Sequence, residues 1–403
     1  MSSLPILIAG AGIGGLTAAN ALRSRGFETE VFDRALELRP AGAGLTIQAN
    51  AVRALSLLRL DSAVQEAGWP FTTGEIRRAD GRRLGGLGFE GLVERIGAPM
   101  VGIRRSKLQA LLLREAGPVT TGLAAERFES DADGVTLRLS DGSTRRGALL
   151  IGADGIHSAI RAELHGRREP RYSGYTCWRG TAEMDHRVIA TLKIPDLFEI
   201  WGRGTRFGGV RVDSEHVYWF AVRNAPPRTD DEPGTRKARL IELFASSTVG
   251  ERYASPVPEL LEATPESTLL HNDIVDRPPS RRWGRGRVTL LGDAAHPMTP
   301  NMGQGACQAI EDAVVLADRV ARSDDPVAGL RRYETARMDR ANGFVDASHR
   351  FGRLAQWAHP LSCRLRDAML ALTPTSVVRQ RMIKVLTMTP VDSAAWSASS
   401  RTS

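Results

Sequence analysis

The sequence predicts an α/β fold in which a parallel-sheet nucleotide-binding domain is interrupted by an antiparallel-sheet lobe and followed by a helical C-terminal section. Three observations indicate this. An apolar strand, a glycine-rich turn and a helix open the chain at residues 5–25, buried-strand patterns return near residues 149 and 288, and an aromatic, β-branched stretch occupies 172–220. Strands that alternate with helices favour a parallel sheet, whereas short strands joined by glycine turns favour an antiparallel one.

The positions of these patterns predict how the chain is divided. The nucleotide-binding domain is expected to be discontinuous, and the lobe to be inserted into it. The expected limits are residues 1–75, 100–170 and 280–328 for the nucleotide-binding domain, 76–99 and 171–279 for the substrate-binding β-sheet lobe, and 329–390 for the helical section. Residues 391–403 are rich in Ser and Ala, which predicts a flexible tail.

Composition excludes several classes of function. Only four of the 54 basic residues are lysines, and the other 50 are arginines spread along the whole chain rather than gathered in one stripe, so we do not expect nucleic-acid binding. No apolar run approaches the ~20 residues that cross a bilayer, and the N-terminal segment has no secretion signal. Three cysteines without C-x-x-C spacing predict free thiols in the cytoplasm and no metal site.

The first chemical motif is the turn GAGIGG at residues 10–15. Gly10, Gly12 and Gly15 occupy a G-x-G-x-x-G frame between a strand and a helix, with Gly14 in the same turn. Such a turn lets a pyrophosphate approach the backbone and the helix N-terminus. Asp33 ends the second strand and is followed by Arg34. The distance of Asp33 in sequence from the glycine turn is close to the ~20 residues at which a carboxylate accepts hydrogen bonds from ribose hydroxyls. The motif predicts a bound dinucleotide and does not distinguish FAD from NAD.

Two later segments make that distinction by resemblance. GADGIHSAIR at residues 152–161 resembles the DG motif of flavoprotein hydroxylases related to p-hydroxybenzoate hydroxylase, and GDAAHPMTPNMGQGACQAIEDA at 292–313 resembles the GD motif of the same family. The order and spacing of the motifs match as well, and the resemblance extends to about residue 390. Within the family, the chain most resembles the branch of salicylate, 3-hydroxybenzoate and urate hydroxylases. It implies FAD in a Rossmann-like domain.

The resemblance also implies roles for individual residues. Asp293 would accept hydrogen bonds from the ribityl chain, the segment from Pro297 to Gly303 would pass beside the isoalloxazine ring, and the helix that begins at Gly303-Gln304-Gly305 would direct N–H groups at the flavin. Arg105 would lie near the pyrophosphate, although Arg104 beside it leaves that register open. The DG motif would serve FAD and the reductant. The predicted cofactor-binding residues are Gly10, Gly12, Gly14, Gly15, Asp33, Arg34, Arg105, Asp154, Arg161, Asp293, Pro297, Gly303, Gln304 and Gly305.

Several of these residues have a plainer interpretation. Asp154 could cap the helix that follows it, and Arg161 could be a cation on the surface of that helix. His157 and His296 lie inside the motifs, and we interpret both as structural. Glu311 and Asp312 are expected on the helix surface or in packing rather than as general bases.

The family resemblance implies an FAD-dependent, NAD(P)H-consuming monooxygenase that hydroxylates an aromatic or heteroaromatic molecule with O2 through a flavin C4a-hydroperoxide. Arg206 and Tyr218 are the candidate catalytic residues, because their spacing resembles the arginine–tyrosine pair that contacts substrate in the urate-hydroxylase branch. An arginine there would stabilise an anionic substrate. The alternative for Tyr218 is a packing role in the sheet, with its hydroxyl at the rim.

Other functions stay open at this point. The same scaffold serves FAD-dependent epoxidases, reductases and oxidases, and a non-catalytic flavin-binding regulator is an alternative from another class. A flavin halogenase is disfavoured, because the first lysine is Lys107 and no W-x-W-x-I-P motif occurs. The basic amphipathic segment 377–386 predicts a packed C-terminal helix or a dimer contact rather than a membrane-surface helix, and we expect a monomer or homodimer without stable membrane insertion.

Overall fold

The computed structural model describes residues 4–38, 44–89, 91–229, 231–232, 234–246, 251–392 and 396, and its centre is a six-stranded sheet. Five strands pair in parallel, and the short edge strand β18 pairs antiparallel with β19. In order across the sheet they are β18 (Gly284–Arg285), β19 (Val288–Leu290), β12 (Leu149–Gly152), β1 (Ile6–Ala9), β2 (Thr29–Asp33) and β8 (Val119–Thr121). The predicted parallel sheet is confirmed, and its strands come from three separate stretches of the chain.

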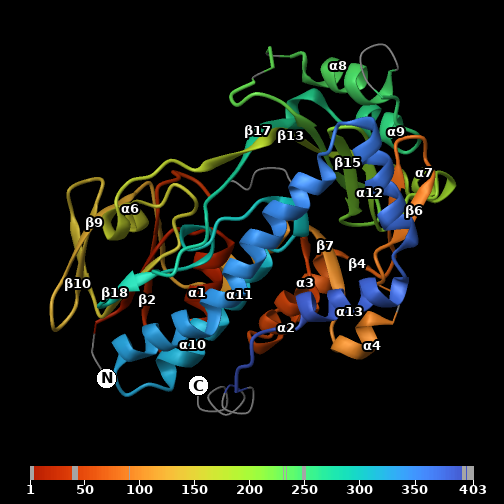
Figure 1. Ribbon diagram of the computed structural model, residues 1–403. Coiled ribbons are helices and arrows are strands. Elements are labelled where there is room, and N and C mark those ends of the chain that lie inside the picture. Colours follow the sequence, from red (N-terminus) through yellow and green to blue (C-terminus); the bar gives the residue numbers. More distant parts are fainter. Residues whose placement is uncertain are drawn as a thin grey trace.

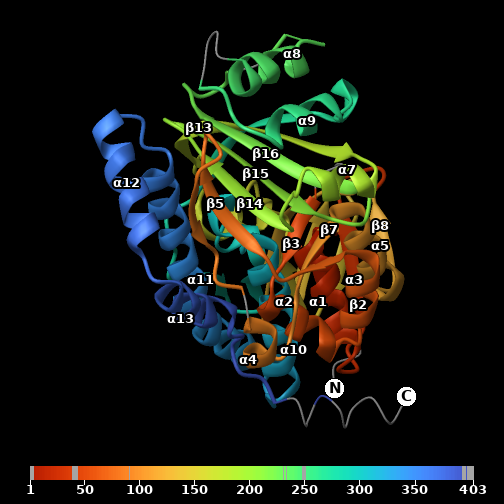
Figure 2. The same cartoon turned by 90° about the vertical axis from the view of Figure 1, so that its right-hand side faces the viewer.

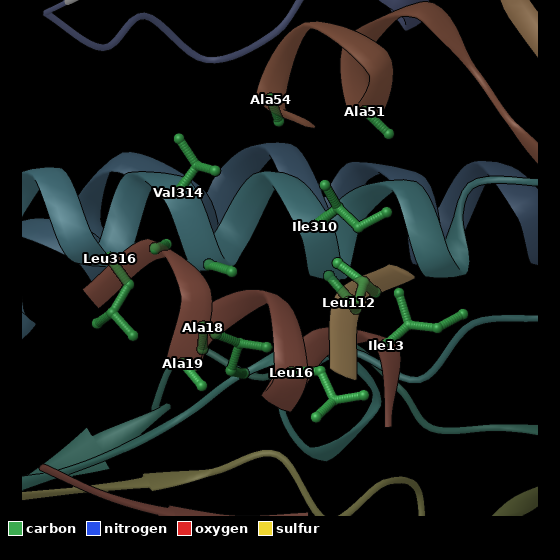
Figure 3. Packing of buried hydrophobic residues seen from close by; sticks show 14 of the residues in the cluster. Ile13, Leu16, Ala18, Ala19, Ala51, Ala54, Leu112, Ile310, Val314 and Leu316 are labelled. Carbon is green, nitrogen blue, oxygen red and sulfur yellow. The ribbon is translucent and has the colours of Figure 1, made fainter. Parts of the chain in front are cut away.

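Helices α1 (Ile13–Arg23), α5 (Arg105–Glu115) and α10 (Gly305–Ala321) form the core beside this sheet. Figure 3 shows Leu16 of α1, Leu112 of α5 and Ile310 of α10 gathered at their crossing, and all three are fully buried. The apolar residues of α1 recur at helical spacing, which is why one of its faces enters the core. The long helix α11 (Pro326–Ala355) packs along α10, and the side chain of Asp325 caps its first turn (Figure 1).

A seven-stranded sheet forms the second lobe. Its strands pair antiparallel except for β14 and β5, and Figure 2 shows it between helices α8 and α9 on one side and strands β3 and β7 on the other. In order they are β17 (Leu270–Asp276), β13 (Arg171–Glu183), β16 (His216–Asn224), β15 (Thr205–Arg211), β14 (Leu197–Trp201), β5 (Gly74–Arg78) and β6 (Arg83–Gly86). The expected antiparallel insertion is therefore present, although the domain limits stay predictions.

One face of this sheet is buried under short helices, namely α7 (His186–Thr191), α8 (Arg236–Leu240), the π-helical turn η1 (Ile241–Ala245) and α9 (Val257–Glu262). Along β16 the residues Val217, Trp219 and Ala221 enter that apolar cluster. Because neighbouring strand residues point to opposite faces, Tyr218 and Phe220 point the other way, toward the nucleotide-binding lobe.

Smaller elements connect the two lobes. A three-stranded sheet of β3 (Gly44–Ile47), β7 (Met100–Arg104) and β4 (Trp69–Phe71) lies between them, and β9 (Ala125–Ser130), β10 (Val135–Leu139) and β11 (Thr144–Gly147) form a peripheral sheet. The remaining elements are α2 (Ala49–Leu57), α3 (Asp61–Ala67), α4 (Leu92–Ile96), α6 (Ala159–His165) and the 3-10 turns η2 (Glu266–Thr268), η3 (Gly292–Ala294) and η4 (Pro300–Met302).

The C-terminal section is helical, as expected, and continues from α11 into α12 (Pro360–Leu372) and α13 (Thr375–Leu386). The amphipathic segment 377–386 forms α13, whose Met382, Ile383 and Leu386 pack against the main core. The predicted flexible tail lies mostly outside the described residues. Among the residues that are described, no helix combines the length and apolarity needed to span a membrane.

Candidate functional site

The three sequence motifs meet at one edge of the central sheet. Strands β2, β1, β12 and β19 run parallel, so the residues that follow their carboxyl ends share that edge, which is where such sheets bind ligands. Backbone hydrogen bonds join the segments: Ala153 N donates to Ala9 O at 2.8 Å and Leu291 N to Gly152 O at 2.9 Å. The glycine turn, the DG segment and the GD segment therefore form one continuous rim.

Two glycines of the first turn are required by the fold, and a third faces open space. A Cβ on Gly15 would lie 1.9 Å from the carbonyl oxygen of Gly10, and Gly10 itself has a φ of +104°. A Cβ on Gly12 would have no heavy atom of the described residues within 4 Å. Helix α1 starts directly after Gly12, with no acidic residue in its first turn. The turn thus offers free N–H groups and space, which fits a pyrophosphate.

Asp33 is tied to the glycine turn. Its Oδ2 accepts a hydrogen bond from Ala11 N at 2.7 Å, and its Oδ1 accepts one from Ala35 N at 2.8 Å. A carboxylate oxygen has two lone pairs, so both oxygens keep capacity for a ribose hydroxyl. Arg34 beside it is exposed. The roles of both residues toward the cofactor stay predictions.

Asp293 stands at the start of η3, in the GD segment. Its side chain is solvent-exposed at this edge of the sheet; the packing around it still raises the pKa of its carboxyl, while the charges of His296 and Arg105 act to lower it. Arg105 therefore lies close enough to Asp293 to act on it electrostatically. Arg104 instead forms an ion pair with Asp213 of the other lobe at 3.4 Å. Of the two candidate arginines, Arg105 is thus the one near the cofactor edge.

Asp154 and Arg161 hold the rim together. Asp154 Oδ2 accepts hydrogen bonds from Ala159 N at 2.7 Å and from Ile160 N at 3.3 Å, which caps α6. Arg161 Nη1 donates to the carbonyl oxygens of Ala294 and Ala295 at 2.8 and 2.9 Å. Asp154 therefore has the helix-capping role that is its plainer interpretation. Arg161 connects α6 to the GD segment, and its side chain is half-buried rather than a free cation on the surface.

The other oxygen of Asp154 points to a ligand. Oδ1 is buried without a hydrogen-bond partner among the described residues, and desolvation raises the pKa of this carboxyl. An unsatisfied buried acceptor beside a glycine turn is what a hydroxyl-bearing or amide-bearing cofactor would satisfy. The open position at Gly12 and this acceptor together fit a dinucleotide.

The loop from Pro297 to Gly305 is held by a buried amide network. Gln304 is fully buried, and its Nε2 donates to Gln48 Oε1 at 2.6 Å, while its Oε1 accepts from Asn50 at 3.2 Å and from Gln308 at 2.7 Å. Gly303 takes a φ of +62°, which favours glycine. The Gln304 side chain therefore positions the loop, and the backbone N–H groups that begin α10 stay available for a flavin.

Behind this loop lies a buried ionic cluster. His296 Nε2 is 2.5 Å from Asp312 Oδ2, and Arg337 of α11 pairs with both Asp312 and Glu311. Every one of these side chains is buried. The sequence predicts Glu311 and Asp312 on the helix surface or in packing, and the structure places both of them in the packed interior. His296 is likewise a structural residue here, whereas His157 is exposed.

The other face of the seven-stranded sheet packs against strands β3 and β7. Strands β13 and β16 pair Thr181 with Tyr218 and Arg179 with Phe220, so these side chains share one face. A Cβ on Gly44 of β3 would lie 2.4 Å from Tyr218 Cβ, which shows how closely Tyr218 stands over the nucleotide-binding lobe. Tyr218 therefore packs between the sheet and the main core, and its role toward the substrate stays a prediction.

Tyr218 has a cation beside it, and that cation is Arg179. Desolvation raises the pKa of Tyr218, and the Arg179 charge and side-chain hydrogen bond lower it by less. The tyrosine therefore stays protonated and acts as a hydrogen-bond donor. Arg179 Nη2 donates to Asn272 Oδ1 at 2.5 Å, and its buried Nε has no partner among the described residues. The contact between Arg179 and Tyr218 depends on the register of β13 with β16, and no motif in the sequence indicates it.

Arg206 occupies a different position. Arg206 lies on β15 opposite Val222, whereas Tyr218 lies on β16 opposite Val210. The two candidate catalytic residues are therefore four residues apart along the strand direction, which corresponds to roughly 14 Å. Its side chain is 2% exposed, and its nitrogens contact Gln356 at 3.2 Å, Glu199 at 3.4 Å and Asn301 of η4. The structure does not bring Arg206 and Tyr218 together, and it gives Arg206 a bracing position between the sheet, α11 and the loop.

The comparisons with known proteins agree with this geometry. Residues 3–348 match the family model described as an FAD binding domain. The chain is 41% identical over 392 residues to the aurachin C monooxygenase/isomerase of Stigmatella aurantiaca, covering 97% of this chain and 100% of that protein. It is 38% identical over 377 residues to the chloroplastic zeaxanthin epoxidase of Nicotiana plumbaginifolia, covering 87% of this chain and 54% of that longer protein.

A solved structure matches the fold over almost its full length. The crystal structure of Klebsiella pneumoniae HpxO complexed with FAD and uric acid superposes with a TM-score of 0.86 at 32% sequence identity. The match covers 95% of this chain and 96% of that one. The likeness includes both lobes, because neither lobe alone could account for that coverage.

Proposed function

The chain belongs to the FAD-binding family of aromatic-ring monooxygenases related to p-hydroxybenzoate hydroxylase, and from this premise we propose that it hydroxylates an aromatic or heteroaromatic small molecule with NAD(P)H as the reductant. It is an FAD-dependent monooxygenase. The observation that supports the proposal most directly is the position of Tyr218, which stands over Gly44 of β3 with the charges of Arg179 and Arg105 acting on it.

The chain's own residues would bind and orient the cofactor. The turn at Gly12 and the first N–H groups of α1 would hold the pyrophosphate, Asp33 and Asp293 would accept hydrogen bonds from sugar hydroxyls, and the start of α10 would face the flavin. When bound, FAD supplies the redox chemistry by which two electrons from NAD(P)H and one O2 yield a hydroxylated product and water. The Gln304 network keeps the loop beside it in one conformation.

Tyr218 and Arg179 would act on the substrate. Because Tyr218 stays protonated, it can donate a hydrogen bond to an oxygen substituent of a ring, and the adjacent guanidinium favours the anionic form of that substituent. A phenolate or enolate is more electron-rich than its conjugate acid, and an electron-rich ring accepts an electrophilic oxygen atom more readily. Phe220 on the same face offers an apolar surface to the ring. This arrangement supports phenols, oxo-purines and related oxygenated heterocycles as the substrate class, and HpxO with uric acid is one such case.

The proposal is tested with the purified protein. We expect a yellow preparation that holds one FAD per chain, and NAD(P)H oxidation that increases when a phenol or an oxo-purine is added. The product should carry one additional oxygen atom by mass spectrometry, with that atom supplied by labelled O2. Stimulated NAD(P)H oxidation that yields only hydrogen peroxide with every ring compound tried would contradict the hydroxylase assignment.

Epoxidation is the second candidate, and the similarity to zeaxanthin epoxidase favours it. The two reactions use the same cofactor and co-substrates but different carbon atoms, since an epoxidase adds oxygen across a non-aromatic carbon–carbon double bond. A neutral polyene offers no ionisable oxygen to Tyr218 and Arg179. Replacement of Arg179 by Gln should therefore reduce hydroxylation strongly and leave alkene epoxidation nearly unchanged.

A further inference from the structure

Helix α12 carries a row of apolar side chains on its outer face. Four large hydrophobic residues are strongly exposed, namely Leu361 (65%), Leu365 (58%), Met369 (51%) and Leu372 (80%). They recur at intervals of four, four and three residues, so they form one stripe along the helix. These four account for half of the eight large hydrophobic side chains that are exposed in the described part of the chain.

The stripe faces outward because the other face of α12 is firmly held. Cys363 and Arg366 are buried, and Arg366 Nη1 donates to the carbonyl oxygens of Gly202 and Ala355, each at 3.1 Å. The guanidinium of Arg366 also stands 5.2 Å from the ring centre of Trp201. Figure 2 shows α12 at the outer edge of the molecule, beside α11 and away from the nucleotide-binding sheet. The exposure is therefore a fixed property of the fold.

The section of the chain that carries the stripe is rich in basic residues, although Asp80 and Glu251 also lie beside α12. Between residues 350 and 386 the sequence has seven basic residues and a single acidic one, Asp367, which is paired with Arg366. The basic side chains that lie exposed in this section are Arg350, Arg353, Arg364, Arg381 and Lys384. Arg364 is an exposed cation on α12 itself, so this helix combines an apolar row with basic charge, the two features by which surface helices bind lipid headgroups.

We propose that the α12 face docks the enzyme peripherally on an anionic phospholipid membrane. The four apolar side chains would enter the boundary between headgroups and acyl chains, and the arginines and the lysine would extend their charged ends to the lipid phosphates. This inference is independent of the proposed reaction, because no residue of α12 belongs to the candidate site.

Charge favours lipid over a second copy of the chain. Two such faces in contact would bring two sets of exposed arginines together. The acidic neighbours Asp80 and Asp367 are already paired with Arg78 and Arg366 and could offset little of that repulsion, which opposes association. The described part of the C-terminal segment does not cover the α12 face either. Its Trp396 is buried beside α1, with the ring centre 5.1 Å from the guanidinium carbon of Arg25. An anionic surface satisfies both the apolar and the cationic groups at once.

The experiment compares sedimentation of the FAD-loaded protein with two kinds of vesicle. One contains phosphatidylcholine alone, and the other contains phosphatidylcholine and phosphatidylglycerol. We expect binding to the second kind, weakened by high salt, and little binding to the first. The double variant Leu365→Gln/Leu372→Gln should lower the partition coefficient about tenfold or more, and Arg364→Gln/Arg381→Gln should remove the preference for phosphatidylglycerol.

A matched control keeps the result specific. Leu113→Gln changes another exposed leucine, on α5, and should bind vesicles as the unchanged protein does. Flavin content and thermal unfolding of each variant verify that the fold is intact. Absence of binding to either vesicle, equal loss of binding in the control, or a dimer in light scattering that only the α12 variants dissociate would each overturn the proposal.

Discussion

Arg337 on α11 donates through Nε to Asp312 Oδ1 on α10 at 2.7 Å, and both side chains are fully buried. The same guanidinium pairs with Glu311 and donates to Gln308 Oε1 at 2.5 Å and Thr389 Oγ1 at 2.8 Å. One side chain thus ties the helix of the flavin loop to the C-terminal section. A buried charge needs partners of this kind, and removing one of them leaves the others uncompensated.

The first prediction concerns the stability that depends on this cluster. Arg337→Met should lower the free energy of unfolding by about 3–5 kcal/mol, because Glu311 and Asp312 would keep buried charges without their main partner. Urea denaturation followed by circular dichroism measures the change. Arg340 also contacts Glu311 but is partly exposed, so Arg340→Met should lower the stability by less. An equal loss in the two variants would contradict the importance of the buried pair.

The second prediction is a dependence of stability on acid. Burial alone would raise the pKa of Glu311 and that of Asp312. The charge of Arg337 nevertheless lowers the pKa of Glu311 below its ordinary value, and the charges of His296 and Arg337 do the same for Asp312. A carboxylate with a lowered pKa in the folded state contributes stability above its unfolded pKa of about 4, and that contribution is lost as the pH falls through the folded value. The melting temperature should therefore decrease on acidification below about pH 4, and Glu311→Gln should make that decrease shallower, although it also lowers stability at neutral pH.

The third prediction separates cofactor binding from folding in the glycine turn. Gly12→Ala places its methyl group in open space where the pyrophosphate would lie, so the protein should fold and bind FAD at least tenfold more weakly. Gly15→Ala places a methyl group against the Gly10 carbonyl, so the fold itself should lose stability. Isothermal titration with FAD and thermal unfolding of the FAD-free proteins distinguish the two. A Gly12→Ala protein that binds FAD normally would contradict the position given to the pyrophosphate.

The fourth prediction distinguishes the two arginines of the sheet. Arg179→Gln and Tyr218→Phe should lower kcat/KM for an oxygenated ring by tenfold or more while the melting temperature changes little, because both residues would act on the substrate. Arg179→Lys should restore part of the activity. Arg206→Gln should instead lower the stability by about 3 kcal/mol, since Arg206 is a buried brace with Glu199 as its ionic partner.

The outcome that would reverse this assignment is specific. If Arg206→Gln leaves the melting temperature unchanged and abolishes substrate-stimulated flavin reduction, Arg206 is the substrate-contacting arginine that the sequence predicts. Unchanged product yield in both Arg179→Gln and Tyr218→Phe would remove those two residues from the site.

The fifth prediction concerns the thiols. All three cysteines are buried and free, and desolvation raises the pKa of Cys177 to about 11 and that of Cys307 to about 12. Because the thiolate is the reactive form, neither should react with a disulfide reagent near neutral pH on the time scale of minutes. Titration with such a reagent in urea should then reveal three thiols. Rapid labelling of the native protein would mean that one of them is accessible.

The sequence was sufficient for those parts of the structure that depend on local chemistry. The spacing of Gly10, Gly12 and Gly15 follows from a turn in which Gly15 touches backbone, and the parallel pairing of β1 with β2 follows from helix α1 between them. The same reasoning placed Asp293 after a buried strand, at the edge where the structure has it. Each of these features is decided within about thirty residues, so a single stretch of sequence contains its cause.

Other features depend on residues that are far apart in the chain. Gln48 and Gln304 form a hydrogen bond across 256 positions, and no periodicity in either segment indicates the other. Arg179 and Tyr218 become neighbours only through the register of β13 and β16, because a shift by one residue would turn one of them to the opposite face. The same register places Arg206 and Tyr218 four residues apart along one face of the sheet, and whether both contact the substrate stays a prediction.

The interrupted order of the central sheet has a consequence for biosynthesis. Strand β1 emerges from the ribosome early, but β19 follows only at residues 288–290 and Gln304, the amide partner of Gln48, later still. A nascent chain therefore has no complete flavin pocket until about three quarters of it has been made. Cofactor capture must be a late event, and shortened products of interrupted translation should be colourless and prone to aggregation.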